Sequence, residues 1–255
     1  MSSTANRTTA DSALDSALES ALESALESAL DSASRPTRTP VFRRPAVMLL
    51  ATALAGGALA AGSLTTTASA ASSPLRADIV KTATVEKNNP QHNREKADNC
   101  NFYSGYWKPS GDNICSTSTG GVKWRSNNWC ADFVRYVWKK SGAKTSKIDP
   151  WAGSFYRAAK AGTGTWHERG SYVPKPGDAV LYDWDGGKPS LGTNGWDVDH
   201  VGVVVNYSPI GKKLTTIEGN TTKTSSGGGK EGVFLRARSN TERGDVVGYV
   251  SPESR

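Results

Sequence analysis

Large aromatic side chains are almost missing from the first quarter of this 255-residue chain. Residues 1–70 contain no Trp, Tyr, His or Cys, and all eight Trp lie between Trp107 and Trp196. A protein core needs large apolar side chains, so this absence excludes an independently folded domain from residues 1–70. The sequence therefore predicts one globular domain of ordinary size in the C-terminal part.

Two segments without a core of their own make up the N-terminal region. Residues 1–34 contain a Ser-Ala-Leu-Glu/Asp repeat of period four, which is typical of low-complexity, helix-prone sequence; an oligomerising helix is the alternative. Residues 35–70 contain four Arg, then an apolar stretch, then small residues, which is the order of a secretory signal peptide. A retained membrane anchor is the alternative, because the apolar stretch is long enough to span a bilayer.

The chain has no excess of acidic residues. It carries 31 Lys and Arg against 24 Asp and Glu; removal of residues 1–70 takes away five Arg and six acidic residues and leaves a net charge of +8. An exported basic protein is attracted to polyanions, and no nucleic-acid motif is present, so anionic cell-wall polymers are the expected partners. Solubility alone explains the charge equally well. We expect a linker at 71–76 and a monomeric folded domain at 77–255.

Cysteine is scarce, and its number is odd. The three residues are Cys100, Cys115 and Cys130, so one thiol must remain unpaired within the chain. Cys100 and Cys115 lie in a segment rich in Asn, Ser, Gly and Pro that a disulfide would stabilise, and export permits the bond. Cys130 instead begins an apolar periodic run. We predict a Cys100–Cys115 disulfide and a free Cys130, for which a buried structural thiol is the alternative.

Helical and strand patterns follow each other along the chain. A helix is predicted over Cys130–Lys140, because apolar residues recur at helical spacing and Gly142 follows. Its first turn favours a thiolate and a developing oxyanion. A second helix is expected at 150–160. Strand patterns then predict an antiparallel sheet and an α+β fold; the strands are expected at 179–182, 200–206, 214–218, 232–238 and 246–250.

Strand alternation places several polar side chains near one another. His200, Gly202 and Val204 share one face of their strand, and Glu218 and Asn220 share a face of the next. If these strands pair, a carboxylate or amide oxygen accepts from one ring nitrogen of His200 and leaves the other nitrogen for Cys130.

The other two histidines, His92 and His167, lie in a polar stretch and a loop, and both are predicted to be surface residues. Three His without paired spacing and one spare Cys do not make a zinc site. We expect no metal and no cofactor.

Four motifs occur in a characteristic order: Trp129–Val134, Pro176–Val180, Asp199–Val204 and Ile217–Asn220. With them the sequence resembles the CHAP domain (cysteine, histidine-dependent amidohydrolase/peptidase), a branch of the papain-like NlpC/P60 superfamily. The resemblance implies a papain-like fold with N-terminal helices packed on an antiparallel sheet. It also implies a secreted or cell-wall-associated peptidoglycan hydrolase, which cuts the N-acetylmuramoyl-L-alanine amide or a peptide bond of the stem or cross-bridge.

The resemblance assigns roles to individual residues. Cys130 matches the nucleophile, His200 the general base, Glu218 the third member and Asn220 a fourth polar residue. Trp129 stands where other branches have Gln, a side-chain oxyanion donor. The backbone N–H of Cys130 is therefore expected to act together with one Asn, which is either Asn127 or Asn128.

Some relatives bind calcium through an acidic loop before the nucleophile, but residues 120–128 contain no Asp or Glu. Calcium is therefore not expected, and Asp132 is interpreted as a structural hydrogen-bond acceptor. Two other functions remain open. One is a transpeptidase with the same acyl-enzyme, and the other is a non-catalytic cell-wall-binding module. Such a module would use exposed indoles, for which the candidates are Trp124, Trp151, Trp184 and Trp196.

Overall fold

The computed structural model describes residues 24, 73–108, 110–223, 229–241 and 244–255. The predicted repeat at 1–34, apart from Ser24, and the predicted signal peptide at 35–70 lie outside these residues. Within the described part of the chain, no helix combines the length and the apolar character that crossing a bilayer requires.

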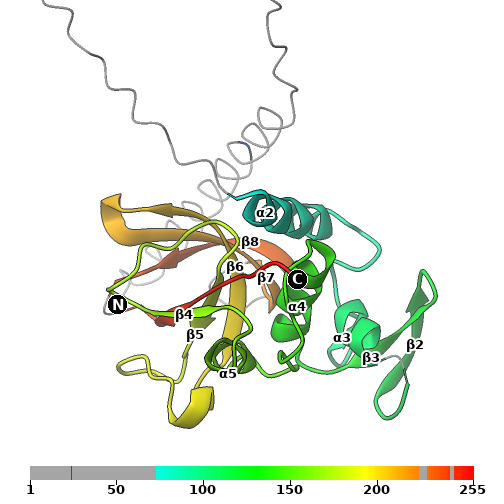
Figure 1. Cartoon of the computed structure of the whole chain (residues 1–255). Coiled ribbons are helices and arrows are strands. Elements are labelled where there is room, and N and C mark those ends of the chain that lie inside the picture. The colour runs from blue at the N-terminus through cyan, green and yellow to red at the C-terminus, as the bar shows by residue number, and fades with distance from the viewer. Residues whose placement is uncertain (1–23, 25–72, 109, 224–228, 242–243) are drawn as a thin grey trace, which may run out of the picture.

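A six-stranded antiparallel sheet lies at the centre of the fold (Figure 1). Its strand order is β4-β9-β5-β6-β7-β8, so most neighbours in the sheet are also close in sequence. All five predicted strands are present, and the edge strand β4 is an addition. The α+β prediction is confirmed. The bounds are Thr165–Glu168 for β4, Ala179–Tyr182 for β5, His200–Ser208 for β6, Lys213–Thr221 for β7, Gly232–Ser239 for β8 and Val246–Ser251 for β9.

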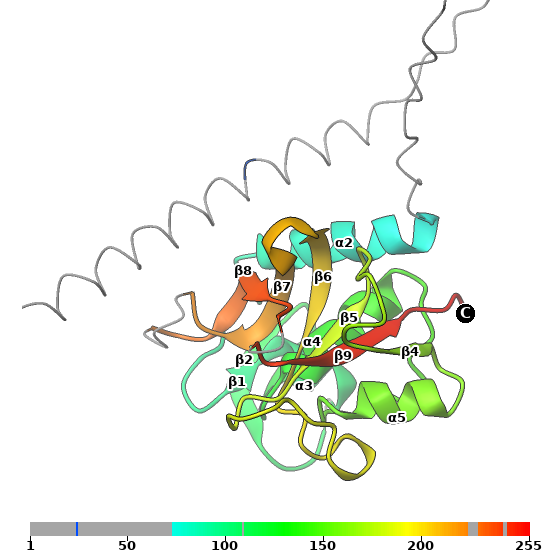
Figure 2. The same cartoon turned by 90° about the vertical axis from the view of Figure 1, so that its left-hand side faces the viewer.

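Helices cover one face of this sheet. The helices are α2 (Pro74–Lys87), α3 (Phe102–Trp107), α4 (Cys130–Lys140) and α5 (Ser154–Lys160). Viewed from the sheet side, β5, β6 and β9 lie in front of α4 (Figure 2). The predicted helix at Cys130–Lys140 is confirmed at both ends, whereas the second predicted helix begins at Ser154.

The alternation predicted for β6 is also confirmed. Val201, Val203 and Val205 join the main core together with apolar residues of α2 and α4. Val204 points to the opposite face, where it packs in a smaller cluster with Tyr182 of β5. His200, two and four positions from Gly202 and Val204, therefore shares their side of β6, at the start of the strand.

A smaller sheet with the order β1-β3-β2 lies beside α3 (Figure 1). Its strands are β1 (Cys100–Asn101), β2 (Ile114–Thr119) and β3 (Val122–Ser126). The predicted Cys100–Cys115 disulfide is confirmed and joins β1 to β2, and Cys130 is free and buried. The disulfide therefore stabilises the segment that leads directly into α4.

A buried ion pair attaches α2 to the sheet. Arg76 donates to Asp178 Oδ1 at 2.7 Å and to the carbonyl of Pro176 at 2.9 Å. Asp178 is fully buried and also accepts from the hydroxyls of Tyr172 and Ser251, each at 2.9 Å. The acid of the Pro-Gly-Asp motif thus has a structural role. Arg76 lies inside the predicted 71–76 linker, so the folded unit begins before the expected boundary.

Candidate active site

Cys130 is the first residue of α4 and is only 6% exposed. Its backbone N–H, at the start of the helix, has no intrahelical acceptor. The preceding indole of Trp129 is fully buried; it stacks on Tyr103 with ring centroids 5.4 Å apart and donates to Glu95 at 3.1 Å. These contacts fix the turn that presents the thiol.

Close contact between α4 and β7 brings the thiol to the sheet. A Cβ added to Gly219 would lie 2.7 Å from side-chain atoms of both Phe133 and Trp129. Only glycine therefore lets the first turn of α4 approach β7 so closely. Gly219 lies between the two polar residues Glu218 and Asn220, so this approach brings the first turn of α4 to the segment of β7 that carries both.

His200 and Glu218 form a buried pair. His200, the first residue of β6, is 2% exposed, and its Nε2 lies 3.1 Å from Glu218 Oε2. Because Nε2 faces the carboxylate, Nδ1 is left for the hydrogen bond with Cys130. The structure thus brings together the three residues predicted to act as nucleophile, base and orienting acid.

Glu218 is fully buried and accepts several hydrogen bonds. Thr216 Oγ1 donates at 2.6 Å, Tyr182 OH at 3.2 Å and Arg238 Nε at 2.9 Å, and Arg238 Nη2 donates to the second oxygen. Burial by itself raises the pKa of Glu218, but the charges and hydrogen bonds of Arg238 and His200 outweigh it and hold that pKa well below its ordinary value. Glu218 is therefore a carboxylate at neutral pH.

The charge of Glu218 acts on His200 in turn. Burial lowers the pKa of His200, but its interactions with Cys130 and Glu218 outweigh burial and raise that pKa to about 9. His200 is therefore an imidazolium at neutral pH. The structure thus places a cation next to the sulfur of Cys130.

Trp184 covers one face of the imidazole. The two rings are stacked, with centroids 4.4 Å apart and an interplanar angle of 22°. The guanidinium of Arg238 lies 5.5 Å from the ring centroids of both Trp184 and Tyr182. Sequence reasoning missed Arg238, Tyr182 and Thr216 as parts of this site. These three residues reach the site through the pairing of β5, β7 and β8 with their neighbours in the sheet. Alternation along a single strand does not indicate which strands pair.

Asn220 has other partners than His200. The β7–β8 register shifts between Glu218 and Thr221, and Asn220 has a positive φ of 57°. Its Oδ1 accepts from the backbone N–H of Trp129 at 2.7 Å, and its Nδ2 donates to Glu231. Of the two partners considered for His200, the structure pairs Glu218 with it. Asn220 instead holds the residue before Cys130.

Comparison with known families agrees with this geometry. Residues 121–220 match the model of the CHAP domain family. Residues 121–220 are thus similar to CHAP domains. The match includes Cys130, His200, Glu218 and Asn220. CHAP domains are a family of cysteine- and histidine-dependent amidohydrolases and peptidases, and peptidoglycan is the substrate that the family implies. No curated protein matches the chain.

The two asparagines before Cys130 lie in different settings. The side chain of Asn127 hydrogen-bonds the carboxylate of Asp132, and its carbonyl accepts from Asn101 at 3.2 Å. Asn128 is exposed. Asp132 is buried and accepts from Ser104 at 2.6 Å, in keeping with its interpretation as a structural acceptor. Asn128 is therefore the better placed of the two candidates to donate to an oxyanion.

The remaining histidines take no part in the CHAP site. His92 is buried, stacks on Phe102 with centroids 4.0 Å apart, and lies 2.9 Å from Glu86. The surface prediction for His92 is wrong, because α2, which was not predicted, carries Glu86 to it. His167 is partly buried and lies 2.9 Å from the Ser251 hydroxyl. Over the described ranges, no group of three or more His, Cys, Asp or Glu is arranged to hold a metal ion.

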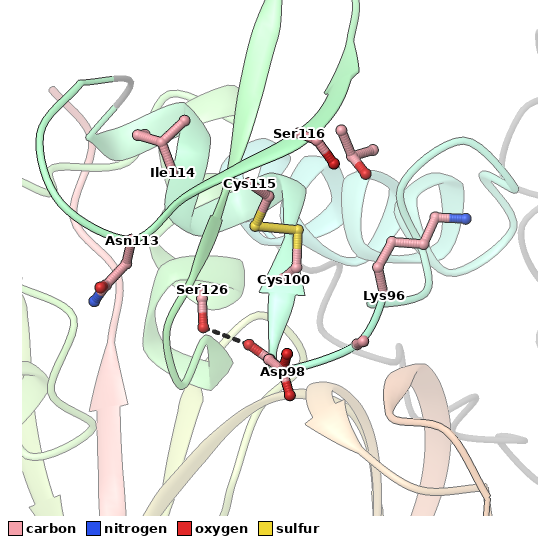
Figure 3. A pocket seen from close by; sticks show the side chains of 10 residues that line it. Lys96, Asp98, Cys100, Asn113, Ile114, Cys115, Ser116 and Ser126 are labelled. Carbon is pink, nitrogen blue, oxygen red and sulfur yellow. Dashed lines mark hydrogen bonds between the residues drawn. A yellow bond between two sulfur atoms is a disulfide. The ribbon is translucent and has the colours of Figure 1, made fainter.

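A cavity of about 340 Å³ lies next to the disulfide (Figure 3). Cys100, Cys115, Lys96 and Asp98 line it, and Ser126 forms part of its wall and donates to the carbonyl of Asp98. None of the predicted catalytic residues lines this cavity. It therefore lies on the small sheet that precedes α4, separate from the Cys130–His200 pair.

Proposed function

We propose that this chain is a secreted peptidoglycan hydrolase that cleaves an amide bond through a thioester on Cys130. The bond is the N-acetylmuramoyl-L-alanine amide or a peptide bond within the stem or cross-bridge. The observation that best supports the proposal is the buried Cys130–His200–Glu218 arrangement, in which His200 is held as an imidazolium next to the thiol. A purely structural cysteine needs no such partner.

Acylation begins from the thiolate–imidazolium pair. The sulfur of Cys130 attacks the amide carbonyl carbon, and the negative charge moves to the carbonyl oxygen. The backbone N–H of Cys130 and the amide of Asn128 donate to that oxyanion. As the tetrahedral intermediate collapses, His200 gives its proton to the leaving nitrogen, the C–N bond breaks, and a thioester and a free amine result.

Deacylation uses the now neutral His200 as a base. It takes a proton from water, the hydroxide attacks the thioester carbonyl, and the C–S bond breaks to release a carboxylic acid and the Cys130 thiolate. Glu218 keeps its charge throughout, orients the ring through Nε2 and stabilises the imidazolium. Asn220 holds the backbone of Trp129 and thereby the start of α4, so it acts as a positioning residue.

Export is supported by the disulfide and by the leader-like segment at 35–70. Disulfides persist outside the reducing cytosol, and Cys100–Cys115 is such a bond. The net charge of +8 in residues 71–255 favours association with anionic cell-wall polymers in addition to peptidoglycan. We propose no nucleic-acid partner, no metal and no cofactor, and a monomeric enzyme.

The test is cleavage of purified peptidoglycan by the wild type, Cys130→Ala and His200→Ala, measured as released amines and as clearing in a zymogram. Both variants should lose at least about a thousandfold in rate. His167→Ala is the matched control, because it removes a partly buried imidazole outside the site, and it should clear like the wild type. Full clearing by Cys130→Ala would end the hydrolase proposal.

The same digest separates the alternatives. Mass spectrometry of the products identifies the cut bond from the new amino terminus or the freed lactyl carboxylate. Wall binding without any released amine would favour a binding module. New amide cross-links formed with an added amine would favour a transpeptidase.

A further inference from the structure

Three of the eight tryptophans are exposed, and all three lie on two neighbouring loops. Trp151 is 46% exposed, Trp184 42% and Trp196 56%. Trp124, also considered as an exposed indole, is only 2% exposed and bonds Thr119, so it belongs to the core. A large aromatic ring that stays exposed to water loses the stabilisation that burial provides. Several exposed indoles on neighbouring loops therefore suggest a binding function.

Trp151 and Trp196 form a contact pair. Their ring centroids are 5.1 Å apart with an interplanar angle of 65°. Trp151 precedes α5, and Trp196 follows the short helix η1 (Thr193–Gly195). A Cβ on Gly153 would lie 1.9 Å from the carbonyl oxygen of Gly195, so the two loops touch backbone to backbone. The pair is therefore fixed in place before any ligand arrives.

Polar groups surround the two rings. Arg157 lies over Trp196 at 5.0 Å from the ring centroid and bonds Asp149 at 3.1 Å. Asp149 also accepts from the backbone N–H of Trp151 at 2.8 Å. Between the rings the backbone carries only the small residues Ala152 and Gly153 on one loop and Gly195 on the other. The patch thus combines two aromatic rings with a guanidinium and a carboxylate.

This composition suits a sugar ring better than a peptide or a lipid. A pyranose has an apolar C–H face that lies flat on an indole and a hydroxyl edge that bonds guanidinium and carboxylate groups. Arg157 and Asp149 pair with each other, but their side chains remain 27% and 54% exposed, and an apolar peptide side chain or an acyl chain would form no hydrogen bonds with these exposed atoms.

The pair is continuous with the candidate active site. Trp196 lies four residues before His200, and Trp184, which stacks on His200, begins the same loop. The two ends of this loop are tied together, because the Trp184 N–H donates to Asp199 at 2.7 Å and the Asp199 N–H donates to the Tyr182 carbonyl at 2.9 Å. A polymer bound at His200 can therefore extend over Trp196.

We propose that Trp151 and Trp196 form a carbohydrate subsite that binds an N-acetylated amino-sugar ring of the glycan strand. The inference rests on the proposed function, because peptidoglycan joins such sugars to the peptide that His200 and Cys130 would cleave. The subsite positions the polymer, and Arg157 and Asp149 bind its polar edge.

Binding is tested apart from catalysis with Cys130→Ala as the parent and a soluble β-1,4-linked N-acetylglucosamine tetramer as the probe. Isothermal titration and Trp fluorescence should detect the tetramer in the parent. Covering about 60 Å² of indole surface corresponds to roughly tenfold in affinity, so Trp151→Ala/Trp196→Ala should weaken binding by at least that factor. Ile210→Ala, which trims a side chain 86% exposed on the helix Ile210–Lys212, is the control and should bind like the parent.

Trp196→Phe keeps an aromatic ring and is the milder variant in case the double variant does not fold. It should bind the tetramer more weakly than the parent and more tightly than the double variant. With Cys130 intact, the double variant should raise KM for polymeric peptidoglycan by a larger factor than it lowers kcat. Absence of tetramer binding by the parent, or equal affinity in the double variant, would overturn the subsite. Self-association that depends on the two Trp, without tetramer binding, would also overturn it.

The two proposals fail separately. Tetramer binding by a wild type that releases no amine would reject the hydrolase and leave the subsite. Amine release with no tetramer binding would reject the subsite and leave the hydrolase.

Discussion

Arg238→Met is expected to lower the free energy of unfolding by about 3 kcal/mol at pH 7. The change removes two hydrogen bonds and the ion pair of the fully buried Glu218, which keeps only its bonds from Thr216, Tyr182 and His200. Breaking a buried ion pair typically costs about 3–5 kcal/mol. The Arg238 side chain is 20% exposed, so water partly compensates and the lower end of that range applies.

The assay is chemical denaturation of the wild type, Arg238→Met, Glu218→Gln and the double variant Glu218→Gln/Arg238→Met. The double variant leaves no buried charge, so it should be more stable than Arg238→Met alone. A loss below about 1 kcal/mol, or strict additivity of the two single changes, would refute the reasoning.

The pH dependence provides a second check on Arg238. The folded-state pKa of Glu218 is depressed, so the stability it contributes is present above its unfolded pKa and is lost as pH falls through the folded pKa. The difference between the wild type and Arg238→Met should therefore be largest near neutral pH. It should narrow below the ordinary Glu pKa of about 4.3. A difference that stays constant down to acidic pH would mean that Arg238 acts by packing alone.

Further predictions concern the titration of His200, the positioning role of Asn220 and the disulfide. The pKa of His200 is raised to about 9, so kcat/KM should fall above about pH 9 as the imidazolium is lost, and Glu218→Gln should move this limb to lower pH. The stability that His200 contributes should likewise be present below its ordinary pKa and lost as pH rises through about 9. Asn220→Gly keeps the positive φ but removes the acceptor for the backbone N–H before α4; it should cost about 1–2 kcal/mol and lower kcat more than it changes KM, and an unchanged kcat would contradict the positioning role. Replacing Cys100 and Cys115 with Ser should lower stability by about 3 kcal/mol, given their separation of 15 residues, and a wild-type denaturation midpoint insensitive to reductant would contradict this.

The parts of the fold that were predictable have strong local periodicity. Helix α4 has a well-defined apolar stripe and a glycine after its end, and both of its bounds were predicted. Strand β5 was predicted with the same accuracy, because Ala179–Tyr182 is a short apolar run between turn signals. The polar, Gly- and Pro-containing surroundings of Cys100 and Cys115, set against the apolar run that begins at Cys130, led to the correct disulfide.

The parts that were missed depend on contacts between distant segments. Arg238 meets Glu218 only through the β7–β8 pairing, whose register shifts after Glu218. The same shift, with the left-handed backbone of Asn220, breaks the alternation that placed Asn220 next to His200. Strands β2 and β3 consist largely of Ser, Thr, Lys and Arg, so no apolar alternation marks them.

If the protein is exported as proposed, the ion pair between Arg76 and Asp178 limits where its N-terminal segment can be cut. A cut after Ala70, where small residues end the leader-like segment, leaves Arg76 attached to α2. Processing a few residues further on would remove Arg76 and leave the Asp178 carboxylate buried without its cation, even though every predicted catalytic residue would remain. A contact remote from the thiol would thus limit the position of any such cut. Amino-terminal sequencing of a stable, N-terminally processed form should find Arg76 retained.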